Sequence, residues 1–110
     1  MTQEQLSQQV AQLNDAHRRQ PGVGWVMTPG VQALGTAGLA RAVEAVRGFD
    51  AFSEDNDPYG ERDFGSFEID GQRLFWKIDY YDLSLTGASP DPADPAVTRR
   101  VLTLLLAEEY

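Results

Sequence analysis

Residues 63–82, DFGSFEIDGQRLFWKIDYYD, decide the fold because they predict a β-hairpin with a defined register. Asp70-Gly71 separates two segments of alternating apolar and polar residues. This dipeptide favours a type I′ turn, in which both central residues need a positive φ. The register set by this turn pairs apolar residues on one face and opposite charges on the other: Phe67 with Leu74, Gly65 with Trp76, Glu68 with Arg73, and Arg62 with Asp79.

Helices and one further strand are predicted before the hairpin. Thr2 and Gln5 form a capping box, which predicts an amphipathic helix over residues 2–19. Residues 23–28 predict a short strand, and Thr36 to Gly48 predicts a second helix. The apolar stripe of the first helix consists of Leu6, Val10, Leu13 and His17. Since His17, the only histidine, continues that stripe, we expect it to pack at the edge of the core and not to act in catalysis.

After the hairpin, residues 83–94 predict a loop, and Asp94 followed by Pro95 predicts the start of a last helix over residues 95–109. The fold class is therefore predicted as α+β. We expect a single compact domain over residues 1–110, with elements in the order α-β-α-β-β-α. A small antiparallel sheet would have the helices packed against it.

Composition limits the class of protein. At 110 residues and 42% hydrophobic, the chain suits one domain with one core. It contains no cysteine, so disulfides and thiolate metal sites are excluded. We expect no signal peptide, no membrane span and no cofactor, and a cytoplasmic location.

Acidic residues are concentrated in the middle of the chain. The formal net charge is −8, and residues 50–94 carry twelve acidic and three basic side chains, a net charge of −9. Residues 49–63, FDAFSEDNDPYGERD, predict an exposed connection held by Phe49, Phe52 and Tyr59. Such a charge argues against direct binding of nucleic acid through phosphate contacts.

The acidic region allows three chemical interpretations. A calcium loop fits poorly, because Tyr59 and Ser66 stand where the fifth and twelfth ligand positions require oxygen donors of another kind. Metal-assisted hydrolysis could use the carboxylates, but no lysine stands beside them in a nuclease-like pattern. A negative surface for a basic protein partner is the third interpretation, and interface-prone tyrosines lie within it. The candidate partner-binding residues are Asp55, Asp57, Tyr59, Glu61, Asp63, Asp79, Tyr81 and Asp82; no catalytic and no metal-binding residue is assigned.

Long strings of the chain resemble a family of small bacterial proteins that is known as a domain of unknown function. The strings are DNDPYGERDFG, FWKIDYYD and SPDPADPAVT, with NDAHRR and TPGVQALG before them. In that family the first helix usually reads NDAFRR, so the resemblance implies a packing role for His17. It also implies an origin on plasmids and other mobile elements, and thus a role in the contest between mobile DNA and host defence.

These observations lead to one main hypothesis and two alternatives. The main hypothesis is a non-enzymatic acidic module that binds a basic nucleic-acid-binding protein. Its specific form is an inhibitor of a restriction or CRISPR complex, with DNA mimicry as one route. The alternatives are a small carboxylate-dependent metal hydrolase and a homo-oligomeric accessory protein of plasmid maintenance. One Asp→Asn change would abolish turnover in the first, and elution at twice the monomer mass would favour the second.

Overall fold

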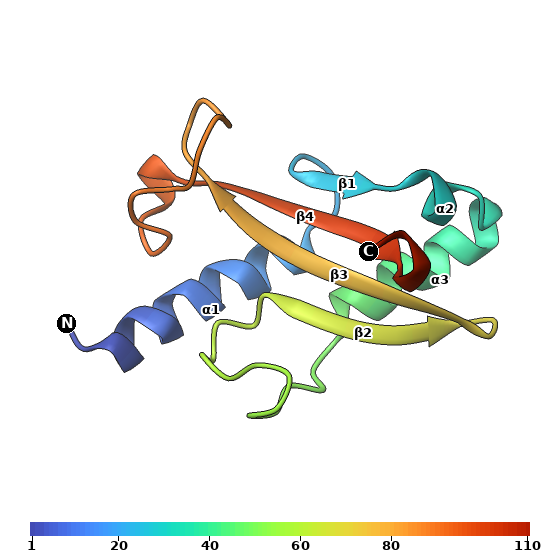
Figure 1. The fold of residues 1–110 in the computed structure, drawn as a ribbon, viewed down its shortest axis with the longest axis horizontal. Coiled ribbons are helices and arrows are strands. Elements are labelled where there is room, and N and C mark those ends of the chain that lie inside the picture. Colours follow the sequence, from blue (N-terminus) through green and yellow to red (C-terminus); the bar gives the residue numbers. More distant parts are fainter.

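The computed structural model describes residues 1–110 and has two layers, a four-stranded sheet and a set of helices on one of its faces (Figure 1). The molecule measures 43 × 32 × 22 Å, and the shortest dimension fits one sheet with one layer of helices. The elements are α1 (Gln3–Arg19), β1 (Trp25–Met27), α2 (Pro29–Gln32), α3 (Gly35–Arg47), β2 (Phe64–Ile69), β3 (Gln72–Tyr81), β4 (Arg99–Leu106) and the 3₁₀ turns η1 (Pro95–Val97) and η2 (Ala107–Glu109). This is an α+β domain, as predicted. No helix is both long and apolar enough to cross a membrane.

The sheet has the strand order β1-β4-β3-β2, so β4 lies inside it and β1 and β2 form its edges. β4 is antiparallel to β3 and parallel to β1, with Trp25 opposite Leu102. The sheet is therefore mixed, whereas the sequence predicted an antiparallel one. β4 can be parallel to β1 because a long segment, which contains α2, α3 and the hairpin, connects the two strands and lets the chain cross back before β4 begins.

The hairpin has the predicted turn and register. Asp70 and Gly71 both have positive φ, 51° and 82°, and Phe67 lies opposite Leu74. Glu68 lies opposite Arg73, and their side chains form an ion pair of 2.8 Å. The predicted contact between Arg62 and Asp79 is wrong.

Arg62 lies two residues before β2 and has a positive φ of 55°, so the extended pairing with β3 does not reach it. The guanidinium instead pairs with Asp15 at 3.0 Å and lies over the ring of Phe52. Asp79 pairs with Lys77.

The predicted last helix over residues 95–109 is wrong, and a strand takes its place. Asp94 does cap a turn, since its Oδ1 accepts from the amide of Ala96 at 2.9 Å, but only the three residues of η1 follow. The apolar run in β4 then lies between two other strands and is buried on both faces of the sheet at Leu104, Leu105 and Leu106. A short apolar run does not by itself distinguish an interior strand from a helix.

The two faces of the sheet have different neighbours. On one face, Leu74, Trp76 and Ile78 of β3 pack with Leu102 and Leu104 of β4 to form the core. α1 and α3 lie behind this face in Figure 1. The other face carries the alternate residues of each strand and is covered only by η2 and the C-terminal residue, because Tyr110 packs edge-on against Phe75 at 5.6 Å.

α1 buries a polar stripe in place of the predicted apolar one. The stripe Leu6, Leu13 and His17 is only half-buried, while Ser7, Asn14 and Arg18 are buried together with Val10 and Ala11. His17 lies at the edge of the core as expected, with its Nε2 3.0 Å from the carbonyl oxygen of Gly24.

Residues 49–63 run along the lower border of the sheet in Figure 1. Phe49 and Phe52 pack edge-on against Trp76, with ring centroids 5.5 and 6.1 Å apart. The prediction that Tyr59 also holds this segment is wrong, since Tyr59 is 80% exposed. Two aromatic contacts in the first four residues leave the rest of the segment to be held by polar interactions.

Candidate functional site: an acidic cluster at the start of β2

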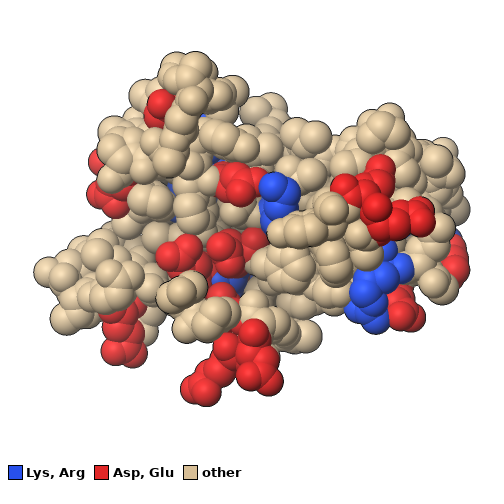
Figure 2. Space-filling model, in the orientation of Figure 1, with Lys and Arg blue, Asp and Glu red and all other residues tan.

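The negative charges of Asp57, Glu61 and Asp79 act on the Asp63 carboxyl where the connecting segment enters β2, and these four carboxylates are called here the acidic cluster. Asp63 lies at its centre and is half-buried. Burial raises the pKa of the Asp63 carboxyl above its usual range, and the negative charges of Glu61, Asp57 and Asp79 raise it further. Figure 2 shows acidic side chains gathered over this part of the surface, with few basic ones between them.

Positive charge near the cluster is limited. Lys77 contacts Asp79 at 2.9 Å, and the hydrogen bond that Asp79 accepts raises the pKa of Lys77. The arginine within the segment, Arg62, is directed at Asp15 on α1 and does not neutralise the cluster. Arg100 is half-buried nearby, and its charge and that of Glu61 attract each other, so Lys77 and Arg100 offset part of the negative charge of the cluster.

Glu61 is held in place by a buried hydrogen-bond chain. The Tyr80 hydroxyl donates to Glu61 Oε1 at 2.9 Å, and Asn14 Nδ2 donates both to the Tyr80 oxygen at 2.8 Å and to the Glu61 carbonyl at 3.0 Å. Arg100 Nε in turn donates to Asn14 Oδ1 at 2.8 Å. Burial raises the pKa of Tyr80, so its hydroxyl remains a donor at neutral pH. The chain links α1, β3 and β4 to the acidic segment and fixes the position of this carboxylate.

Asp57 is fixed by the turn before β2. Its Oδ1 accepts from the amide of Arg62 at 3.1 Å, and its main-chain carbonyl accepts from the amide of Gly60 at 3.1 Å. Gly60 has a φ of 69°, in the left-handed region that favours glycine. The string DPYGER thus forms a closed turn that brings Asp57 back toward Asp63.

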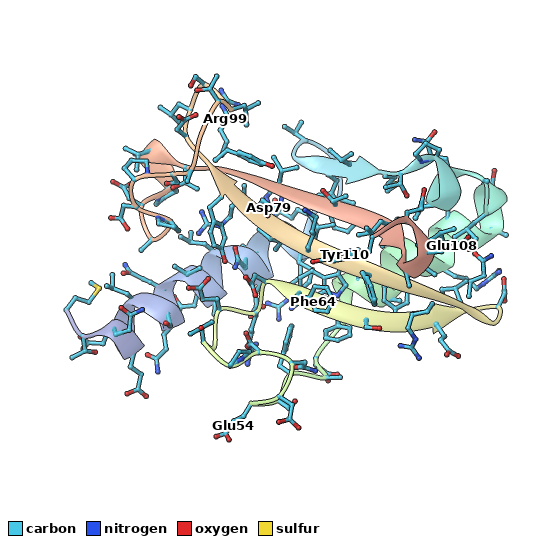
Figure 3. All side chains as sticks on the ribbon, viewed as in Figure 1. Glu54, Phe64, Asp79, Arg99, Glu108 and Tyr110 are labelled. Carbon is cyan, nitrogen blue, oxygen red and sulfur yellow. The ribbon has the colours of Figure 1, made fainter.

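The other four candidate residues are not among the charges that act on Asp63. Asp55 is exposed, and Figure 3 shows its neighbour Glu54 at the tip of the segment, directed away from the sheet. Tyr59 is exposed on the same segment. Tyr81 lies two residues beyond Asp79, at the end of β3, and Asp82 follows it. The carboxylate of Asp82 accepts from the amide of Thr86 and the hydroxyl of Ser84 in a local turn, and these bonds lower its pKa. The sequence thus grouped eight residues, of which the fold brings four together.

The chain matches a known protein family over most of its length. Residues 27–109, about three quarters of the chain, match the family described as "Protein of unknown function (DUF3768)". The chain belongs to the DUF3768 family. No curated protein and no solved structure matches it.

The DUF3768 match begins at Met27 in β1 and ends in η2, so it includes the whole acidic cluster and three of the four strands in full. α1 precedes the match, yet Asn14, Asp15 and Arg18 of α1 hold the acidic segment and the end of α3. In this member of the DUF3768 family, α1 is therefore part of the structure that positions the cluster.

The geometry of the DUF3768 cluster does not resemble a metal centre. No three histidine, aspartate or glutamate side chains lie close enough together to hold a metal ion. One hollow of the surface lies between α2 and α3 and is lined by Gln32, Leu39 and Val43. Another lies between α1 and the acidic segment and is lined by Ser7, Pro58 and Tyr59.

Several residues that build the DUF3768 site were not identified from the sequence. Asn14 and Arg18 are spaced four residues apart and follow Ser7 and Val10 on one face of α1, and this polar spacing was the available signal. Tyr80 was not among the candidate residues, and its hydroxyl is the link between Asn14 and Glu61. No pattern in a single sequence indicates that residues 66 positions apart share a hydrogen bond.

Proposed function

We propose that this protein is a non-enzymatic binding module whose acidic cluster contacts a basic, nucleic-acid-binding protein. The observation that carries the proposal is that hydrogen bonds fix the acidic segment at Glu61 and Asp57, and that the charges of these residues and of Asp79 act on a half-buried Asp63. Carboxylates that are held near one another repel each other, and this repulsion is reduced when cationic side chains approach them. The bound partner supplies positive charge that Lys77 and Arg100 supply only in part.

The proposed consequence is competition with nucleic acid. A cluster of fixed negative charges attracts the same arginine and lysine side chains that bind phosphates. In its specific form, the module inhibits a bacterial restriction or CRISPR complex. Support for that form comes from the net charge of −9 over residues 50–94 and from the mobile-element setting that the resemblance implies.

A nuclease assay with matched charge variants tests the proposal. Asp63→Asn with Asp79→Asn removes two charges from the cluster. Glu4→Gln with Glu108→Gln removes two charges from exposed side chains on α1 and η2 that accept no hydrogen bond from another side chain. Both variants keep the same net charge, so only the position of the lost charge differs. Purified restriction and CRISPR nucleases are assayed for DNA cleavage with each form of the protein present.

We expect the wild-type protein to inhibit at least one nuclease, and excess DNA to relieve that inhibition. Loss of the two cluster charges should weaken inhibition roughly tenfold or more, because close charge pairs across interfaces couple strongly. The control variant should inhibit like the wild type. Equal inhibition by the two variants, or inhibition that DNA does not relieve, contradicts the proposal.

A further inference from the structure

The outer edge of β2 has main-chain groups without hydrogen-bond partners. The amide of Ile78 donates to the carbonyl of Asp63 at 2.8 Å, which sets the phase of the β2–β3 ladder. In an antiparallel pair, hydrogen-bonded and non-hydrogen-bonded residues alternate, so the N–H and C=O groups of Phe64, Ser66 and Glu68 point away from β3. Nothing in the chain bonds to these outward groups.

This edge lacks the usual protection of edge strands. β1, at the opposite edge, has three residues and is followed by Pro29. β2 has six residues, FGSFEI, with no proline and no lysine, and its one charged residue, Glu68, is paired with Arg73. Proteins commonly protect a free edge with short strands, proline or charge, since an exposed edge pairs readily with another strand. Figure 1 shows β2 along the border of the sheet with no strand beyond it.

Charge differs between the two ends of the edge. The acidic cluster lies at the start of β2, around Asp63. At the other end Glu68 is paired with Arg73, and Asp70 is paired with Arg41. Unbalanced negative charge is therefore confined to the end where the strand begins, and it favours a cationic group there.

Apolar side chains lie beside the same edge on the open face of the sheet. Phe64 packs with Phe75 at 5.3 Å between ring centroids, and Phe75 packs with Tyr110. Figure 3 shows Phe64 and Tyr110 on this face, with Asp79 near them. A strand placed beside β2 would direct every second side chain to the face of the sheet that carries Phe64.

We propose that an extended basic segment of the partner pairs with β2 as a fifth strand, with a lysine or arginine beside Asp63 and an apolar side chain against Phe64. This inference rests on the proposed function and names the structural class of the partner's contact. The outward main-chain groups supply hydrogen bonds that any sequence can satisfy. The acidic cluster and Phe64 supply the preference for alternating basic and apolar residues.

Selection from a displayed library of random dodecapeptides tests the inference. The variant Ser66→Pro removes an outward N–H and places a ring in the path of an added strand, while the fold keeps its own ladder, since proline is tolerated at outward positions of edge strands. Ser66→Ala is the matched control, because both variants lose the hydroxyl that accepts from Arg73. Thermal unfolding establishes that both variants are folded. Two further measurements do not depend on the proline variant: N-methylation of alternate peptide nitrogens, and hydrogen exchange of the amides of Phe64, Ser66 and Glu68.

We expect selected peptides to alternate basic and apolar residues and to bind Ser66→Pro about tenfold more weakly than Ser66→Ala. N-methylation should abolish binding, and the three amides should exchange more slowly in the complex. Three results would overturn the inference: no enriched peptides, enriched peptides without basic residues, or equal binding to the two variants. Concentration-dependent protection of these amides in the free protein would also overturn it, because a second copy would then occupy the edge.

Failure of the inference is distinguishable from failure of the proposed function. If selected peptides are sensitive to Asp63→Asn with Asp79→Asn but not to Ser66→Pro, the acidic cluster binds a basic partner without strand addition. The inference is then wrong and the proposed function stands. Nuclease inhibition that ignores the cluster variant contradicts the proposed function, whatever the peptides do.

Discussion

Replacement of Arg18 by methionine should destabilise the protein more than any other single change to a charged residue. The side chain of Arg18 is only 1% exposed. Its Nη1 donates to the carbonyls of Val46, Arg47 and Phe49 at 2.9, 3.1 and 2.8 Å, and its Nη2 donates to Asp15 at 2.8 Å. One guanidinium therefore satisfies carbonyls at and just beyond the end of α3, and it also lies over Trp76 at 5.4 Å.

The size of the effect follows from these contacts. Methionine keeps most of the apolar stem but removes the donor to the carbonyls of Arg47 and Phe49 and leaves Asp15 with Arg62 as its remaining cationic partner. Removing one partner of a buried, hydrogen-bonded charge pair costs about 3–5 kcal/mol. For a domain whose total stability is about 5–15 kcal/mol, this is a large fraction. The midpoint of urea unfolding should fall by about 2 M with little change in its slope.

The matched control is Arg19→Met, because Arg19 is the next residue, is exposed, and donates no side-chain hydrogen bond. Its midpoint should stay near that of the wild type. Urea unfolding followed by circular dichroism measures both variants. A loss for Arg18→Met of less than about 1 kcal/mol, or one equal to that of Arg19→Met, would refute the view that α1 holds the end of α3 and the acidic segment together.

Three further substitutions test other parts of the structure. Gly65→Ala should lower the free energy of unfolding by about 1–3 kcal/mol. The Cβ of the alanine would lie 2.6 Å from Trp76 Cε2 and 2.8 Å from Phe49 Cζ, and both rings are packed in or against the core. Thermal unfolding measures the loss, with Gly48→Ala as the control. Asp63→Asn should be more stable than the wild type at pH 7, since the raised pKa of Asp63 means that the fold disfavours its charged form. The difference in stability should shrink as the pH falls toward 3.8, the usual pKa of an aspartate. A difference that does not change with pH contradicts this. Glu109→Gln should show the opposite dependence, because hydrogen bonds from Thr28, Leu106 and Gly30 lower the pKa of Glu109 in the folded protein. The carboxylate therefore stabilises the fold above its unfolded pKa, and this stabilisation is lost as the pH falls through the lowered, folded pKa. Equal stability of variant and wild type at neutral pH contradicts this.

The hairpin was predictable because its signals are local. The positive φ values that Asp70 and Gly71 adopt are those that their turn requires, and a two-residue turn leaves no freedom in the register. The ion pair between Glu68 and Arg73 follows from that register. α1 was likewise predicted from its capping box and helical spacing. α3 was predicted from helical spacing, but the prediction that Thr36 caps it is wrong, because the helix begins at Gly35 and no side chain caps it.

The last strand was not predictable from the same kind of signal. Asp94 and Pro95 begin a turn in either case, and whether a helix or a strand follows depends on partners far away in the chain. β4 lies between β1 and β3, so its apolar residues are needed on both faces. The β-branched residues Val101 and Thr103 were the local evidence for a strand, and the leucines around them outweighed it.

The acidic cluster was predictable in composition but not in membership. Counting charges located the acidic half of the chain, and it could not show that Asp82 turns into its own loop while Asp57 returns to Asp63. The hydrogen-bond chain from Arg100 through Asn14 to Tyr80 and Glu61 joins residues from four parts of the chain. Such a chain depends on tertiary packing, which periodicity and spacing do not record.

Affinity capture from a bacterial lysate, at low and at high salt, tests the central claim most directly. The bait is the wild-type protein, the cluster variant Asp63→Asn with Asp79→Asn, or the control variant Glu4→Gln with Glu108→Gln. The account predicts that the wild type and the control retain the same nucleic-acid-binding protein at low salt, that high salt releases it, and that the cluster variant does not retain it. Retention of that protein by the cluster variant to the same extent as by the control would contradict the claim that the acidic cluster is the binding site.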